Sequence, residues 1–193
     1  ANLEKAVKKI IFGKFVNAGQ TCIAPDYILL KSGLEDKFVD VFKQNIKELY
    51  SDNAQNSNSY CRIVNEKHFK RLVSYLDEAS QNQSRVVSGG DYDSEQNFIE
   101  PTLILDVPES SKLMQEEIFG PILPIKTYET IEDAVNYINS KEKPLALYVY
   151  SKNKKTIDFS LNNTRAGGGC VNHNLLHYLN HNLPFGGSNN SGI

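Results

Sequence analysis

Segments with helical periodicity alternate with short apolar runs along most of this chain. Apolar residues recur every three or four positions in 3–17, 34–50, 65–79, 130–140 and 153–161, which predicts five amphipathic helices. Strands are expected in the runs DYILLK (26–31), RVVSGG (85–90), FIEPTLILDV (98–107), PILPIKTY (121–128), LALYVYS (145–151) and AGGGCVN (166–172). This alternation favours crossover connections, and hence an α/β fold with a mostly parallel sheet and helices on both faces.

Two further features concern the organisation of the fold. The prolines Pro121 and Pro124 predict that PILPIKTY lies at a sheet edge or at the start of a strand, because proline cannot donate a ladder hydrogen bond. We find no internal repeat and no linker, so one domain is expected over residues 1–193.

Composition excludes several classes of protein. The chain has 193 residues, 40% hydrophobic content and a net charge of −2, which does not favour nucleic acid or an anionic membrane as a partner. It contains no run of about 18 apolar residues. The first residues, ANLEKAVKKI, lack the apolar core of a secretory signal, so we expect a cytoplasmic protein. Cys22, Cys61 and Cys170 are odd in number and far apart, which argues against a disulfide framework and against a metal site.

Cys22 lies at the junction between a predicted helix and a predicted strand. Gly19 can adopt a positive φ and turn the chain out of the helix, and Pro25 prevents the helix from resuming, so Cys22 is expected on a tight loop. Its small neighbours leave the thiol uncrowded, as attack on a carbonyl carbon requires. The carboxyl end of a helix opposes thiol ionisation, so a nearby base or cation must activate Cys22. A lone cysteine is more often a small buried residue, and we keep that interpretation for Cys61 and Cys170.

Three motifs resemble those of the aldehyde dehydrogenase superfamily. GKFVNAGQTCIAPDYILL (13–30) is similar to its cysteine motif, MQEEIFGPILPI (114–125) resembles its second signature, and LPFGGSNNSGI (183–193) resembles a segment near the end of its catalytic domain. KEKPLALYVYS (141–151) fits the region between them, so the resemblance covers nearly the whole chain. APDYILL and EKPLALY look most like the class that includes fatty aldehyde dehydrogenases.

The resemblance implies a reaction and a nucleophile. It implies oxidation of a small-molecule aldehyde to a carboxylic acid with NAD or NADP, in which Cys22 forms first a thiohemiacetal and then a thioester. The backbone amide of Cys22 would help to hold the oxyanion.

The resemblance also implies binding residues. Glu117 matches the family residue that binds the nicotinamide ribose, and Phe119 matches the aromatic residue beside the nicotinamide ring. Phe185, flanked by Thr21 and Ile23, matches a wall of the aldehyde pocket.

The chain also departs from the family pattern. The family's general-base glutamate, its oxyanion asparagine and its cofactor domain are expected to lie outside this sequence, which contains no GxGxxG motif. We therefore expect a catalytic domain that is inactive alone, with a parent enzyme that forms a homodimer or a homotetramer.

Two alternatives remain at this point. Cys22 followed about 150 residues later by Asn172, His173, His177 and His181, with Gln20 as an oxyanion donor, imitates a papain-like thiol hydrolase. That class places its thiol at a helix start within a C-G-[SA]-C-[WY] pattern, whereas here the helix ends before Cys22 and the chain has no Trp. The second alternative is a non-catalytic interaction or oligomerisation module.

Overall fold

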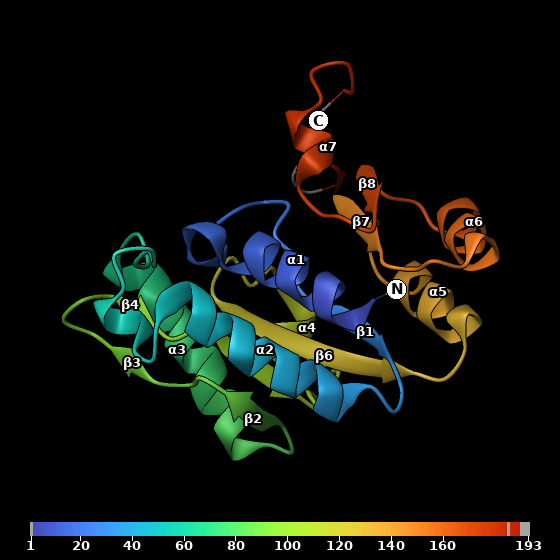
Figure 1. Cartoon of the computed structure of the whole chain (residues 1–193). Helices are drawn as coiled ribbons and strands as arrows, with labels where there is room; N and C mark the ends of the chain where they lie inside the picture. Colours follow the sequence, from blue (N-terminus) through green and yellow to red (C-terminus); the bar gives the residue numbers. More distant parts are fainter. Residues whose placement is uncertain (1, 185, 190–193) are drawn as a thin grey trace.

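The computed structural model describes residues 2–184 and 186–189 and shows helices interspersed with short strands (Figure 1). The helices are α1 (Leu3–Phe15), α2 (Glu35–Tyr50), α3 (Glu66–Gln81), α4 (Lys112–Gln115), α5 (Ile131–Asn139), α6 (Lys154–Asn163) and α7 (Leu176–Leu179), with 3-10 turns η1 (Val16–Gly19) and η2 (Ala54–Asn56). The strands are β1 (Ile28–Lys31), β2 (Arg85–Ser88), β3 (Tyr92–Asp93), β4 (Phe98–Ile99), β5 (Thr102–Leu105), β6 (Ile122–Tyr128), β7 (Ala146–Val149) and β8 (Gly168–Val171).

The largest sheet has four strands in the order β1-β6-β5-β2. β6 pairs in parallel with both β1 and β5, and only β2 runs antiparallel, against β5. All four residues of β5 and the first four of β6 are buried, although successive side chains point to opposite faces, so both faces of the sheet are covered. The predicted α/β fold with a mostly parallel sheet is confirmed.

An edge position for PILPIKTY is wrong, because β6 lies between β1 and β5. The alternative of a strand start is confirmed for Pro121, since β6 begins at Ile122. Pro121 precedes the strand, where a missing N–H costs nothing in the ladder. Pro124 lies opposite Ile104 of β5, whereas the pairing with β1 begins only at Ile125. Pro124 therefore sits where β6 has a neighbour on one side alone, and this local edge is what tolerates it.

The alternation pattern suggested a single sheet, but the strands are divided among separate sheets. β7 and β8 pair in parallel around the α6 crossover, and among the described residues they form a separate two-stranded sheet, as do β3 and β4. Figure 1 shows β7 and β8 beside α1, away from the main sheet.

α1 and α2 lie side by side over the main sheet (Figure 1). The Asn2 side chain caps α1 by accepting a hydrogen bond from the Lys5 amide at 3.1 Å. The buried face of α1 packs on α2 through an edge-to-face contact of Phe15 with Phe42, at 5.7 Å between ring centroids. Within the described part of the chain, no helix is both long enough and apolar enough to cross a membrane.

Candidate active site

The loop that carries Cys22 begins where α1 stops. The sequence predicted a helix to residue 17, but the helix ends at Phe15, and Asn17, Ala18 and Gly19 all have positive φ values of 53°, 52° and 75°. The Asn17 side-chain amide donates to the Gln20 carbonyl at 3.0 Å, which supports this left-handed turn. Cys22 follows in a tight turn, as expected, and the structure shows it to be exposed.

The side chain of Gln20 fixes this loop to a distant segment. Its amide nitrogen donates to the carbonyls of Asn17 and Arg62, at 2.9 and 3.0 Å, and its oxygen accepts from the Val64 amide at 2.9 Å. Both side-chain N–H groups can thus be engaged in holding the backbone. Gln20 is an anchor of the cysteine loop, which does not suit the oxyanion-donor role considered for it in the thiol-hydrolase alternative.

The cysteine loop packs directly on the turn formed by residues 116–120, almost 100 positions later. A Cβ added at Gly19 would lie 2.2 Å from the carbonyl oxygen of Gly120, so only glycine allows the two backbones to approach this closely. A second link is the carboxylate of Asp26, whose Oδ1 accepts from the Ile118 amide at 3.1 Å. Two of the three motifs identified in the sequence are therefore neighbours in space.

Side chains of α3 hold the other side of the 116–120 turn. Arg71 donates to the carbonyls of Glu117 and Ile118, at 3.1 and 2.6 Å, and to the Tyr75 hydroxyl at 2.9 Å. The Tyr75 hydroxyl donates to Glu116 at 2.6 Å. These contacts fix a turn in which Phe119 has a φ of 46°, so that Glu117 is exposed and Phe119 half-buried.

Lys14, Asp26 and Glu117 influence one another electrostatically. Lys14 is completely buried, and its ammonium has no hydrogen-bond partner among the described residues. Burial lowers the pKa of Lys14 to about 8, against the opposing attraction of Asp26 and Glu117. Burial raises the pKa of Asp26, although the charges of Lys14 and Arg71 and the hydrogen bond from Ile118 oppose the shift. The pKa of Glu117 is also raised, first by desolvation of its carboxyl group and then by repulsion from Asp26.

The residues predicted for the aldehyde pocket are only partly brought together. Thr21 and Ile23 flank Cys22 on the same turn, and Thr21 is half-buried. The side chain of Ile23 is buried, and its carbonyl accepts a hydrogen bond from the Tyr148 hydroxyl at 2.8 Å, which ties the cysteine loop to β7. Phe185 lies outside the described residues.

The histidines named in the thiol-hydrolase alternative are engaged elsewhere. Nδ1 of His177 lies 3.5 Å from Sγ of Cys170, and this ring is tilted against Tyr148. Nδ1 of His173 lies within hydrogen-bond distance of the backbone of Asn174. A thiol–imidazole neighbour pair thus forms at Cys170 instead of Cys22, which does not favour a papain-like arrangement.

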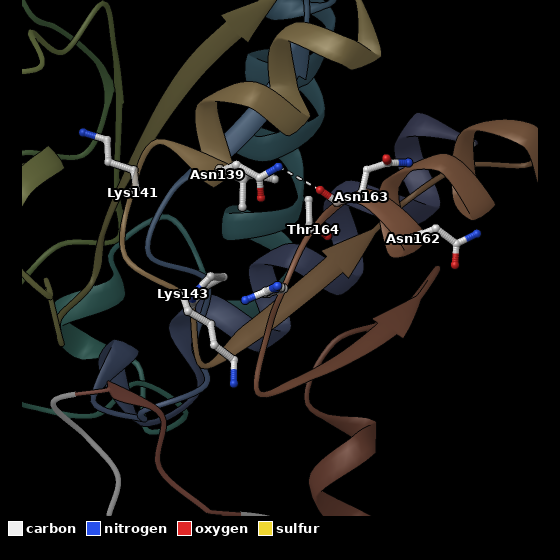
Figure 2. A pocket seen from close by; sticks show the side chains of 9 residues that line it. Asn139, Lys141, Lys143, Asn162, Asn163 and Thr164 are labelled. Atoms are coloured by element: carbon white, nitrogen blue, oxygen red, sulfur yellow. Dashed lines mark hydrogen bonds between the residues drawn. The ribbon is translucent and has the colours of Figure 1, made fainter.

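One hollow of the described structure lies away from these motifs. Its volume is about 390 Å³, and its lining includes Asn139, Lys143, Asn163 and Thr164 (Figure 2). The Asn139 amide donates to the Asn163 carbonyl at 2.7 Å across it. No predicted site residue lines it, and the site is placed at Cys22 because the exposed thiol and the two packed motifs are there. The residues that the structure describes contain no cluster of three metal-ligating side chains.

Reasoning from the sequence missed Lys14, Asp26 and Arg71. Lys14 had a detectable signal, because it falls on the apolar face of α1 with Ile10 and Ile11, where a lysine must be buried. Asp26 directly precedes the apolar run of a strand, and its partner is 92 residues away, so its role depends on the tertiary fold.

Comparison with known proteins identifies relatives along the whole chain. The 4,4'-diaponeurosporen-aldehyde dehydrogenase of Staphylococcus aureus is 45% identical over 193 residues, which are 100% of this chain and 41% of that protein. Aldehyde dehydrogenase family 3 member A2 of Mus musculus is 44% identical over 192 residues, which are 39% of its length. The mouse protein named aldehyde dehydrogenase, dimeric NADP-preferring, is 41% identical, with 41% of its length covered. The predicted resemblance to the class that includes fatty aldehyde dehydrogenases is confirmed, and the chain spans about 40% of these relatives.

The fold comparison agrees. A structure described as the substrate-bound state of Staphylococcus aureus AldH matches with a TM-score of 0.95 and 44% identity, over 100% of this chain and 42% of that one. The sequence model of the aldehyde dehydrogenase family matches residues 1–193. The chain therefore belongs to the aldehyde dehydrogenase family.

Proposed function

We propose that this chain is the cysteine-bearing catalytic part of an enzyme that oxidises aldehydes to carboxylic acids with NAD or NADP. The observation that carries the proposal is the exposed thiol of Cys22 on a loop packed against the Glu117–Phe119 turn. The relatives are dehydrogenases of about twice this length or more, and one is described as dimeric, which supports a complete enzyme that assembles as a homodimer or a homotetramer.

Cys22 is the nucleophile. Its sulfur forms a C–S bond with the aldehyde carbon while the C=O π electrons move to the oxygen, which takes up the proton that the thiol gives up. Loss of hydride from this carbon to the nicotinamide, and of the hydroxyl proton to solvent, would convert the thiohemiacetal into a thioester. Water then cleaves the C–S bond, which releases the carboxylic acid and restores the thiol. Developing negative charge on the carbonyl oxygen is stabilised by the backbone N–H of Cys22. Thr21 and Ile23, with Phe185, border the aldehyde.

The 116–120 turn suits the nicotinamide riboside end of a dinucleotide. The Glu117 carboxylate is exposed and can accept hydrogen bonds from two ribose hydroxyls, while the half-buried Phe119 offers an aromatic surface beside the ring. When bound, the nicotinamide supplies the hydride acceptor. The role of this chain is to hold the nicotinamide riboside in a fixed position relative to Cys22.

Substitution of the nucleophile tests the proposal. In a complete enzyme that contains this chain, Cys22→Ala should abolish aldehyde oxidation and leave dinucleotide binding largely intact, because no cofactor contact is removed. Reduced dinucleotide is followed by absorbance, and dinucleotide binding by calorimetry. Cys61→Ala is the matched control, since Cys61 is also exposed but lies outside the motifs. Sustained turnover by Cys22→Ala would refute the proposal.

A further inference from the structure

One side chain joins the cysteine loop to the turn that carries Glu117. Asp26 follows Cys22 by four residues, and its carboxylate accepts the N–H of Ile118, which lies between Glu117 and Phe119. Ile118 is fully buried, so without Asp26 this N–H would lose its side-chain acceptor in a place closed to water. The position of the turn therefore depends on the position of the Asp26 carboxylate.

The negative charge of Asp26 is partly compensated by the positive charge of Lys14. Lys14 is completely buried in α1, and its ammonium lacks a hydrogen-bond partner among the described residues, yet it interacts electrostatically with both Asp26 and Glu117. A buried ammonium is costly, and it persists only where nearby negative charge compensates it. Lys14 thus supplies charge and not a direct contact, which leaves the carboxylate of Asp26 available to Ile118.

Arg71 completes the arrangement from the other side. Its guanidinium donates to the carbonyls of Glu117 and Ile118, while Asp26 accepts the amide of Ile118. The peptide groups of the turn are therefore held through both donors and acceptors, from α3 on one side and from the cysteine loop on the other.

We propose that Asp26 is a positioning residue, which fixes the Glu117–Phe119 turn against the Cys22 loop and has the buried Lys14 ammonium as its counter-ion. This inference rests on the proposed function, in which hydride passes from a carbon bound to Cys22 to a nicotinamide held at Glu117 and Phe119. Displacement of this turn would misplace the hydride acceptor, and errors of about 1 Å cost on the order of 100-fold in rate.

The test compares two steps in a complete enzyme that contains this chain. Acylation of Cys22 by a nitrophenyl ester, without dinucleotide, reports the thiol alone, whereas single-turnover hydride transfer reports the thiol and the turn together. Asp26→Ala should lower the ratio of hydride transfer to acylation by about tenfold or more, and Asp26→Asn, which keeps an acceptor for Ile118, should lower it less. Asp40→Ala, at an exposed position of α2, should leave the ratio unchanged. An equal loss in both steps, or no loss in either, would overturn the inference.

If Asp26→Ala does not fold, a second set of variants tests the inference: Lys14→Met, Asp26→Asn and the double variant that combines them. Lys14→Met and Asp26→Asn each leave one buried charge uncompensated, whereas the double variant removes both charges and keeps an acceptor. We expect the double variant to melt at a higher temperature than Asp26→Asn and to recover part of its hydride-transfer ratio. A double variant worse than both single variants in this ratio would contradict the inference. Loss of turnover in Cys22→Ala together with a normal ratio in Asp26→Ala would refute the inference alone and leave the proposed function standing.

Discussion

At the scale of single residues, the buried Lys14 makes stability depend on pH in a recognisable window. Folding disfavours its protonated form and lowers its pKa from 10.5 to about 8. Between these two pH values the unfolded chain binds more protons than the folded one, so this contribution to the free energy of unfolding rises with pH. A shift of this size corresponds to about 3 kcal/mol.

The measurement is a difference between two proteins. Tyrosines such as Tyr27, whose pKa burial raises to about 12, lower the stability above about pH 10, where they ionise only in the unfolded chain. Lys14→Met retains these tyrosines, so the difference in the free energy of unfolding between the two proteins isolates Lys14. From pH 8 to pH 10, we expect the free energy of unfolding of the parent protein to rise relative to that of Lys14→Met. Denaturant melts of both proteins measure this difference. A difference that stays constant over this range would show that folding does not lower the pKa of Lys14.

Glu117 and Glu116 are adjacent, yet the structure gives them different surroundings. Both residues are exposed, but the Glu116 carboxylate accepts a hydrogen bond from the Tyr75 hydroxyl, whereas at Glu117 it is the backbone carbonyl that accepts one, from Arg71. In a complete enzyme, Glu117→Gln should slow single-turnover hydride transfer about tenfold, because it weakens the acceptor for the ribose hydroxyls. Glu116→Gln is the matched control, since its amide oxygen can still accept from Tyr75. If Glu116→Gln slows hydride transfer more than Glu117→Gln does, the assignment of the ribose contact to Glu117 is wrong.

At the scale of elements, the contact between the cysteine loop and the 116–120 turn depends on Gly19. Gly19→Ala should destabilise the protein, because the residue has a φ of 75° and its new Cβ would lie 2.2 Å from a backbone oxygen of Gly120. Gly33→Ala is the matched control, with a φ of 84° but no atom within 4 Å of the added Cβ. The control should cost about 1–2 kcal/mol, and Gly19→Ala about 1–3 kcal/mol more. Equal losses in denaturant melts would contradict the close approach of the two segments.

The elements also show what could be read from the sequence. The amphipathic helices were predicted to within about two residues, because one buried face imposes its period on the sequence. The central position of β6 was not predicted. Pro124 is tolerated there because pairing with β1 begins only at Ile125, and this register cannot be read from the sequence of β6 alone. By contrast, the tight loop at Cys22 could be predicted from the local turn signals. The Asp26–Ile118 hydrogen bond joins residues 92 positions apart and required the tertiary structure.

At the scale of the whole molecule, the chain carries the reacting thiol and one end of a cofactor site. Its hydrophobic core runs from α1 through the main sheet to α3 and is formed by buried residues between Val7 and Ile125. Its relatives are more than twice as long. Glu117 and Phe119 address only the riboside end of a dinucleotide, and the sequence has no GxGxxG turn for the pyrophosphate that provides much of the binding.

We therefore expect residues 1–193 alone to melt cooperatively but neither to bind NAD or NADP nor to oxidise aldehydes in the steady state. The contacts offered by Glu117 and the half-buried Phe119 must first offset the loss of translational and rotational freedom, which costs at least about 4 kcal/mol. We therefore expect a dissociation constant above about 1 mM. Calorimetric titration with each dinucleotide, beside an absorbance assay for its reduced form, measures both properties, and a complete relative serves as the positive control. Saturable binding below about 0.1 mM, or sustained turnover by this chain, would mean that the 193 residues contain a dinucleotide site that Glu117 and Phe119 do not account for.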